Sequence, residues 1–232
     1  MPDFGDYILI YTIFFILVFV APSLWLKYTF KKNDRVLEEM PFSPRELGNT
    51  ILKELEITTV SFEETKTFDH YDPENKTVRL LADRFDRKSL TAISIICHEI
   101  GHAIQDHNDY KPLKQRTDII KKTSWLSRIS NTVMLFAVPA ILATGAYSFL
   151  KICVIIILIS TLIGLLTHLI TLEVEIDASF NRAMPILQEK IPHMYHDACR
   201  SVLKAAAFTY VASVFANVFS FRYLWLLLTR AV

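Results

Sequence analysis

The chain has 232 residues, of which 52% are hydrophobic and 21% are charged, and its formal net charge is +1. The near balance of charges gives no reason to expect a nucleic-acid partner, and the lack of low-complexity tracts argues against a disordered or repetitive protein. So many apolar residues beside so many charges predict apolar blocks that alternate with a polar domain. The cysteines Cys97, Cys153 and Cys199 are too widely spaced for a disulfide framework or a thiolate metal site.

The first apolar block covers residues 7–26 and is almost unbroken. It has about the 20 residues that a helix needs to cross a bilayer. Asp3 and Asp6 precede it and no basic residue does, whereas a secretory signal begins with basic residues. We therefore predict a transmembrane helix that the protein retains.

Further apolar blocks occupy the second half of the chain. The runs 133–150 and 152–172 are separated at Lys151 and predict a transmembrane hairpin over residues 133–172. The block 205–228 is interrupted by Arg222, so it predicts either one tilted span or a span followed by an interfacial helix.

Lys and Arg residues follow the first span and precede both the hairpin and the last block. Because the cytoplasmic flanks of membrane helices carry the excess of basic residues, we expect the N-terminus outside and residues 27–131 in the cytoplasm. Residues 173–204 return to the same side. The sequence thus predicts a multi-pass protein of the cell membrane whose two polar segments meet at the cytoplasmic face.

The first polar segment, 27–131, has the elements of a small α+β unit. Ser43, Pro44 and Glu46 form a capping box that predicts the start of a helix. Residues 57–62 are rich in β-branched side chains and predict a strand, and a turn signal at 72–75 precedes a returning strand over 77–81. A helix with an apolar strip is predicted from about residue 87 to residue 107.

That last helix carries His98, Glu99 and His102. Residues four apart lie on one face of a helix, so both imidazoles can reach one zinc ion at about 2.0–2.1 Å. Glu99, beside the first histidine, can take the proton of a water molecule that the metal has made more acidic. The spacing therefore predicts a zinc hydrolase with His98 and His102 as metal ligands and Glu99 as the base.

A catalytic zinc site needs a third protein ligand and an open position. A metzincin would have glycine at 105 and histidine at 108, but Gln105 and Asn108 stand there. His107 lies off the face of the histidine pair. Acidic residues where the third apolar run emerges are better placed, and from the residues alone the ligand is left open among Glu173, Glu175 and Asp177.

Four stretches, 69–73 (DHYDP), 97–105 (CHEIGHAIQ), 110–114 (YKPLK) and 174–179 (VEIDAS), resemble the YugP-like family of neutral zinc metallopeptidases of bacterial membranes. The likeness runs from about residue 69 to residue 210. More distantly, the chain is similar to gluzincin membrane peptidases such as the heat-shock membrane protease and the CAAX prenyl endopeptidase. Those proteins pair the histidine motif with a later Glu-x-x-Ala-Asp.

The resemblance implies that Glu175 is the third zinc ligand, in a set with His98 and His102. Ala178 matches the alanine of the gluzincin motif, but Ser179 replaces its final aspartate, which orients a ligand histidine. Asp177 or Asp106 could take over that role. The implied fold is an α+β, mostly helical integral membrane protein, with a small gluzincin-like zinc-peptidase domain joined to about four transmembrane helices.

The function that we expect is hydrolysis of peptide bonds by an integral-membrane zinc endopeptidase with one Zn²⁺ and a cytoplasm-facing site. Its partners would be polypeptide substrates, membrane proteins among them, and the lipid bilayer. The alternative is a zinc-stabilised membrane scaffold or adaptor without turnover. An extended substrate could add a strand along the 77–81 edge. The residues considered as donors to the oxyanion are Arg182, His193, His196 and Tyr210, and His168 is a further candidate functional residue inside a span.

Overall fold

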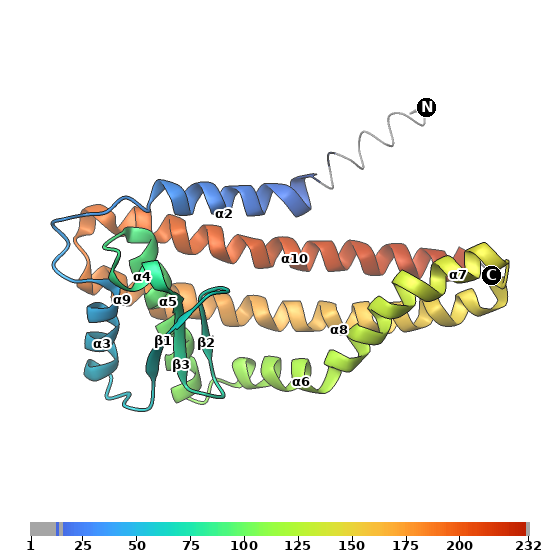
Figure 1. The fold of residues 1–232 in the computed structure, drawn as a ribbon, viewed down its shortest axis with the longest axis horizontal. Coiled ribbons are helices and arrows are strands. Elements are labelled where there is room, and N and C mark those ends of the chain that lie inside the picture. The colour runs from blue at the N-terminus through green and yellow to red at the C-terminus, as the bar shows by residue number, and fades with distance from the viewer. Residues whose placement is uncertain (1–12, 14–15, 231–232) are drawn as a thin grey trace.

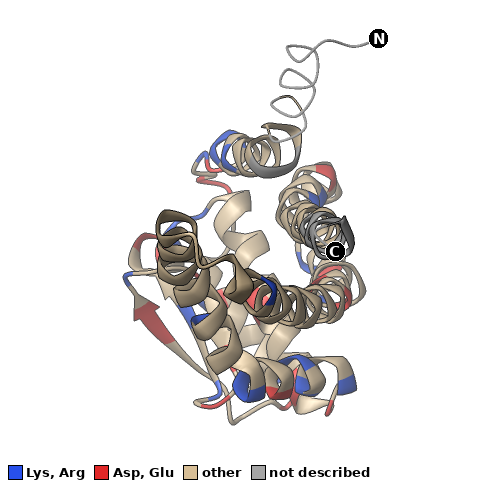
Figure 2. Cartoon of the chain, turned by 90° about the vertical axis from the view of Figure 1, so that its right-hand side faces the viewer, with Lys and Arg blue, Asp and Glu red and all other residues tan. Residues whose placement is uncertain are grey.

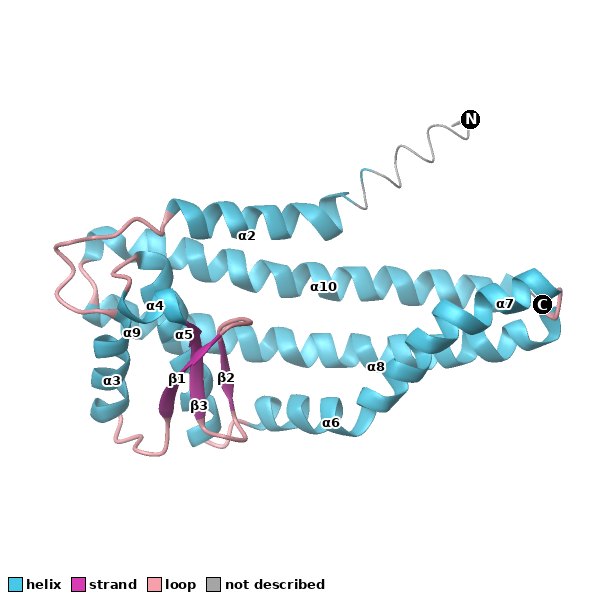
Figure 3. Ribbon diagram, in the orientation of Figure 1, coloured by secondary structure: helices cyan, strands magenta, loops and turns pink. Residues whose placement is uncertain are grey.

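The computed structural model describes residue 13 and residues 16–230. Residues 7–12, 14 and 15 of the predicted span 7–26 therefore lie outside the described residues. Most of the described residues are helical, and they include one small sheet. Long helices run side by side along the molecule, and the sheet and the shorter helices gather at one end of them (Figures 1 and 3).

The long helices are α2 (Ala21–Lys32), α6 (Lys111–Thr132), α8 (Leu150–Ile176) and α10 (His196–Arg230), and the short helix α7 (Val138–Thr144) follows α6 along the chain. The π-helical segment η2 (Val133–Ala137) joins α6 to α7 without a break. Three stretches of the described residues are long and apolar enough to cross a membrane, namely Lys111–Thr144, Tyr147–Lys190 and His193–Phe219. Seen from the end of the α7–α8 hairpin, the nearest helical turns carry almost no charge (Figure 2).

The hairpin between α7 and α8 reverses at Gly145, which has a left-handed backbone with φ of +73°. This conformation suits glycine because it has no Cβ atom. We expected the break at Lys151, and that detail is wrong, since Lys151 lies in the first turn of α8. The apolar character of the chain is continuous on both sides of Gly145, so composition alone did not reveal the turn.

The helix α3 (Pro44–Glu54) begins with the predicted capping box. Ser43 Oγ accepts a hydrogen bond from the backbone N–H of Glu46, and the Glu46 carboxylate accepts one from the backbone N–H of Ser43. These bonds satisfy two of the donors that a helix N-terminus leaves free. The short elements elsewhere are η1 (Ile16–Val20), α4 (Ala82–Asp86), η3 (Tyr147–Phe149) and η5 (His193–Tyr195).

The sheet has three strands in the order β1-β3-β2: β1 (Ser61–Thr65), β2 (His70–Asp72) and β3 (Thr77–Leu81). The prediction of β3 and of the turn before it is confirmed. The strand predicted over 57–62 corresponds to β1, which begins only at Ser61, so its predicted bounds are wrong. Ile57 instead completes the C-terminal end of α3, because its backbone N–H donates to the carbonyl of Leu52. The partner that forms the hairpin with β3 is β2, which we did not predict, and β1 pairs with β3 in parallel.

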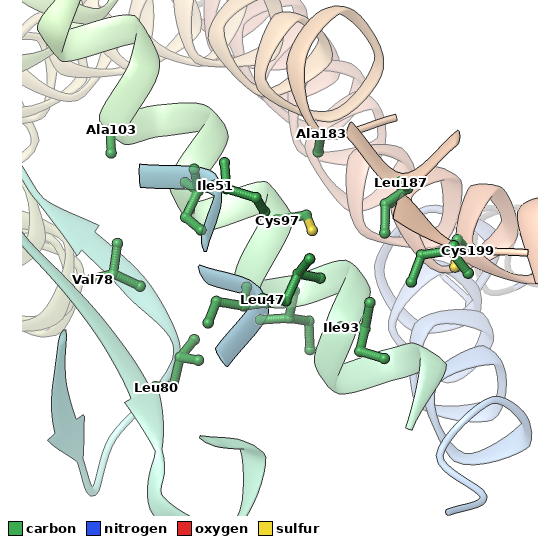
Figure 4. Close-up of a cluster of buried hydrophobic side chains, with 14 of the residues drawn as sticks. Leu47, Ile51, Val78, Leu80, Ile93, Cys97, Ala103, Ala183, Leu187 and Cys199 are labelled. Carbon is green, nitrogen blue, oxygen red and sulfur yellow. The ribbon is translucent and has the colours of Figure 1, made fainter. Parts of the chain in front are cut away.

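The helix α5 (Leu90–His107) lies at the centre of the small domain, and Ser89 caps its N-terminus through the backbone N–H of Ala92. On one side it packs against α3 and the sheet through Leu47, Ile51, Val78 and Leu80 (Figure 4). On the other side Cys97 faces Leu187 and Cys199, from α9 (Met184–Lys190) and α10. Because both sides of α5 are buried, the position of its polar residues is fixed by the core.

Candidate metal centre and active site

A third face of α5, between the two packed sides, carries the two histidines of the predicted motif. The rings of His98 and His102 are 4.7 Å apart between centroids and stand nearly perpendicular to each other. Both side chains are largely buried. A single helical turn thus presents two imidazole nitrogens to the same point, as residues four apart in a helix do.

Glu175, at the end of α8, completes this group. Its Oε2 atom lies 3.2 Å from Nε2 of His98 and 3.5 Å from Nε2 of His102. Ligands placed tetrahedrally at about 2.1 Å from zinc are separated by about 3.4 Å, so these distances fit one zinc ion. Glu175 is only 2% exposed, and Oε2 has no hydrogen-bond donor in the described structure. A buried carboxylate oxygen of this kind needs a cation, and the donor set of two imidazoles and a carboxylate suits zinc.

The other two acidic candidates for the third ligand point elsewhere. Glu173 accepts a hydrogen bond of 3.4 Å from the Tyr110 hydroxyl. Asp177 accepts hydrogen bonds from Gln105, Asn181 and Arg182. Among the described residues, only Glu175 is grouped with the histidine pair.

The second nitrogen of each imidazole has its own partner. Nδ1 of His98 lies 3.0 Å from Ser179 Oγ, and Nδ1 of His102 lies 2.9 Å from Gln105 Oε1. The amide group of Gln105 donates in turn to the carbonyl of Val174 and to Asp177. An amide oxygen can only accept, so the proton of His102 sits on Nδ1 and leaves Nε2 free to bind a metal.

Sequence reasoning placed Asp177 or Asp106 in this orienting role. Asp177 does take part, but through Gln105 rather than directly. Asp106 is a wrong candidate, because it is engaged on the opposite side of α5 by the Tyr71 hydroxyl and by Lys76. Ser179 holds the place that we assigned to it. Gln105 was missed, although it lies one turn after His102 and is fully buried, which is unusual for glutamine.

Close packing of two helices brings these residues together. A Cβ atom added to Gly101 would stand 2.7 Å from the carbonyl oxygen of Ala178, so only glycine fits at this crossing. Ala178 belongs to the π-helical segment η4 (Asp177–Ala183), which directly follows α8. Irregular π-helical turns are common at functional sites. Here the contact presses Glu175 and Ser179 against the histidine face of α5.

Glu99 lies beside the histidine pair and is buried. Burial raises the pKa of its carboxyl group to about 7, although the neighbouring His98 acts in the opposite direction. The backbone N–H of Tyr71, in β2, faces this carboxylate. A bound dication would favour the ionised form of Glu99, the form that can accept a proton.

A pocket of about 340 Å³ opens next to these residues. It is lined by the three grouped residues and Glu99, by residues of β2 and of the loop before it, by one face of α6 and by Tyr210 of α10. Nη1 of Arg116 lies 3.4 Å from Oε1 of Glu175, and the Tyr210 hydroxyl faces the same carboxylate. Sequence reasoning named Tyr210 but missed Arg116, which shares a face of α6 with Leu113, Thr117 and Ile120.

The remaining candidates lie away from this pocket. Arg182 pairs with Asp177 and stacks over Tyr110, while His196 bonds to the carbonyl of Ile191 and His193 lies against the His196 ring. His107 borders a separate pocket on the far side of α5, and His168 borders another between α2, α8 and α10. None of these side chains lines the pocket at the histidine pair, so Arg182, His193 and His196 are wrong candidates for an oxyanion donor.

Comparison with known proteins agrees with this geometry. A family model described as "Putative neutral zinc metallopeptidase" matches residues 7–229. The chain is similar to "Putative membrane protease YugP" of Bacillus subtilis (strain 168), with 28% identity over 214 residues, which cover 89% of this chain and 92% of that protein. No solved structure matches. Because the family model covers almost the whole chain, the protein belongs to the family of neutral zinc metallopeptidases, a conclusion that the predicted resemblance anticipated.

Proposed function

We propose that the protein is an integral-membrane zinc endopeptidase in which His98, His102 and Glu175 hold the metal and Glu99 is the general base. One observation carries this proposal: the three ligand atoms lie within 4.8 Å of one another and border an open pocket that also contains a buried carboxylate. A structural zinc site is closed by four protein ligands, whereas a catalytic one keeps a position open.

Zinc bound there would supply a Lewis acid that polarises a peptide carbonyl and acidifies water. The residues of the chain do the rest. Glu99 accepts the proton of the attacking water and later delivers it to the departing amine, so that no net proton is lost from the site.

Arg116 and Tyr210 are the donors best placed to stabilise the negative charge on the carbonyl oxygen. Both reach the Glu175 carboxylate from the pocket side. A guanidinium group stays charged at every physiological pH and offers several N–H donors, so Arg116 can bond to Glu175 and to a substrate oxygen at once. Preorganised donors of this kind act on the transition state more than on the substrate.

An extended substrate would lie along β2. We expected the 77–81 edge in this role, and that expectation is wrong, because β3 is the middle strand and both of its edges are paired. Strand β2 is paired on one side only, and Phe68, His70 and Tyr71 of this region line the pocket. Main-chain pairing to an edge strand would hold a substrate in extended form without a strong demand on its sequence.

The proposal includes the position of the protein in the cell membrane. Residues 27–131 and 173–204 would form its cytoplasmic part, with spans at 7–26, at 133–172 and within 205–228. The basic residues lie mostly at the end of the helices that carries the sheet, and the opposite end has Lys151 at the hairpin. This asymmetry supports a pocket that faces the cytoplasm.

The test is hydrolysis of casein, an unfolded generic substrate, by purified zinc-loaded protein in detergent, compared with Glu99→Gln. We expect the native protein to cut and Glu99→Gln to hold equal zinc without cutting. Glu173→Gln is the matched control, because this acidic residue lies outside the pocket, and it should cut like the native protein. If zinc is bound and a broad set of substrates stays intact, the scaffold hypothesis takes the place of the peptidase.

A further inference from the structure

Resting on the proposed function, we infer that the pocket lies at the membrane surface and that its substrates are polypeptides anchored in the same membrane. The cut would fall in the segment that directly leaves their transmembrane span. The first evidence is the length of α8. Its apolar part, from Ile152 to Leu172, has 172 − 152 + 1 = 21 residues. At about 1.5 Å per residue this stretch is about 31 Å long, close to the ~30 Å of a hydrocarbon core.

The hairpin end of this stretch has the side chains of a membrane interface, and the other end is marked by a charge. Tyr147 and Phe149, both exposed, stand beside Lys151 at the hairpin end. At the other end Leu172 is followed at once by Glu173. Tyrosine, tryptophan and basic side chains gather at the headgroup level, so the boundary at the hairpin lies near Lys151. The apolar stretch that begins there is about as long as the hydrocarbon core is thick, which places the other boundary near Leu172.

Neighbouring helices mark a similar level. The Trp25 ring of α2 packs edge-on against Phe208 of α10 at 5.2 Å, and both side chains are partly exposed. On α6, Trp125 is 59% exposed and lies between Lys122 and Arg128, each about one turn away. Three helices outside α8 thus carry exposed aromatic side chains where the bundle meets its charged part, which is the arrangement of an interfacial belt.

The pocket lies at the level of these interfacial aromatic side chains rather than further out in the cytoplasm. Glu175 follows Leu172 by three residues, which corresponds to about 4.5 Å along the helix axis. Tyr210, which lines the pocket, is two residues further into the bundle than Phe208. Ile120 and Lys121 of α6 line it as well. The metal-binding residues would therefore stand within about one or two helical turns of the hydrocarbon boundary.

The rim of the pocket has an apolar side chain suited to that position. Phe68 lies in the loop between β1 and β2, is 64% exposed and borders the pocket. This loop extends from the sheet in the direction of the hairpin end of the molecule (Figure 1). An exposed phenylalanine on such a loop is suited to contact with lipid at the interface.

This position selects the substrate. An extended chain advances about 3.3–3.6 Å per residue, so a polypeptide that emerges from the membrane reaches the pocket within its first few residues. Anchoring in the same membrane also confines the substrate near the enzyme, which raises its effective concentration. A free polypeptide has neither advantage and must approach through the headgroup layer.

The test uses the full-length protein in liposomes with two substrates. One is a 21-residue Leu/Ala transmembrane helix followed by an unstructured casein-derived tail of about 40 residues, and the other is the same tail alone. We expect cuts in the anchored substrate to cluster within about ten residues of the span, and the free tail to be cut at least about tenfold more slowly. Cuts spread evenly along the tail, or equal rates for both substrates, would overturn the inference. Glu99→Gln controls for contaminating proteases.

A second measurement separates this inference from the proposed function. A spin label is attached at Phe68→Cys and, as a control, at Leu55→Cys, which is exposed at the end of α3, remote from the hairpin (Figure 1). The native cysteines are buried, so the unsubstituted protein serves as the labelling blank. At position 68 the spin label should collide more often with oxygen, which dissolves in lipid, than with a water-soluble nickel chelate. At position 55 it should not. If neither substrate is cut but this pattern appears, the peptidase proposal fails and the interfacial position stands; equal chelate access at both positions refutes the position.

Discussion

The substitution Gly101→Ala tests whether the helix crossing at Ala178 sets the metal site. The new Cβ atom would stand 2.7 Å from the Ala178 carbonyl oxygen. Carbon and oxygen atoms in ordinary close contact are about 3.3–3.6 Å apart, so α5 and η4 must separate by at least ~0.6 Å. Metal–ligand distances tolerate about 0.2 Å, and we therefore expect Glu175 to fall out of reach of the histidine pair.

The expected loss of zinc affinity is about 10- to 100-fold or more, which is at least ~1.4–2.7 kcal/mol. Stability should change less, because alanine favours a helix by about 1 kcal/mol over glycine and overpacking costs about 1–3 kcal/mol. Zinc affinity is measured by competition with a chelator in detergent, and stability by thermal unfolding of the metal-free protein. Affinity and stability therefore report on different consequences of the same clash.

Gly48→Ala provides the matched control. Its added Cβ atom would stand 2.8 Å from the Phe62 ring and 2.9 Å from the Ile96 side chain, in the core between α3 and α5. This variant also places a Cβ atom within 3.0 Å of its neighbours, but these are side-chain ends that can shift, and they lie away from the metal-binding residues. It should therefore leave zinc affinity unchanged. Native zinc affinity in Gly101→Ala, or an equal loss of affinity in both variants, would refute the reasoning.

Further predictions concern the partners of the metal site, the oxyanion donor and acid stability. Ser179→Ala removes the Nδ1 partner of His98 and should weaken zinc binding about tenfold, whereas Ser179→Asp should restore it; chelator competition that shows no change in Ser179→Ala contradicts this. Arg116→Met should lower kcat about 10²- to 10³-fold at full zinc content, and an unchanged kcat would exclude the oxyanion role. The hydrogen bond from the Asn75 side chain is the main cause that lowers the pKa of Asp72 from 3.8 to about 2. This stabilisation is present above about pH 4 and is lost as the pH falls toward 2, so Asp72→Asn should flatten the decrease of the unfolding temperature in that range, and identical curves would contradict the assignment.

Local signals in the sequence were sufficient for several elements. Three features depend only on residues that are close together in the chain: the capping box at Ser43, the turn before β3 and the histidine helix. Each has the predicted form. The structure also brings Glu175 to the histidine pair, as the resemblance implied. That step required knowledge of other proteins, because Glu173 and Asp177 are equivalent to Glu175 in composition and differ only in the direction of their side chains.

The features that were missed depend on contacts between distant segments. β2 is only three residues long, and its pairing with β3 gives it a strand conformation that its sequence does not signal. Gln105 looks like an ordinary polar helix residue until Val174 and Asp177 are placed beside it. Arg116 lines the pocket only because α6 packs against α8. Its partner there, Glu175, is 59 residues further along the chain. Periodicity and propensity describe neighbours along the chain and do not reach such partners.

The most direct test of the metal centre is X-ray absorption at the zinc edge, with zinc-loaded protein in detergent and Glu175→Ala beside it. We predict a first shell of imidazole nitrogen and carboxylate or water oxygen at about 2.0–2.2 Å, with no sulfur, and loss of tight zinc binding in Glu175→Ala. A shell that contains sulfur at about 2.3 Å, or zinc bound to Glu175→Ala as tightly as to the native protein, would contradict the site built from His98, His102 and Glu175.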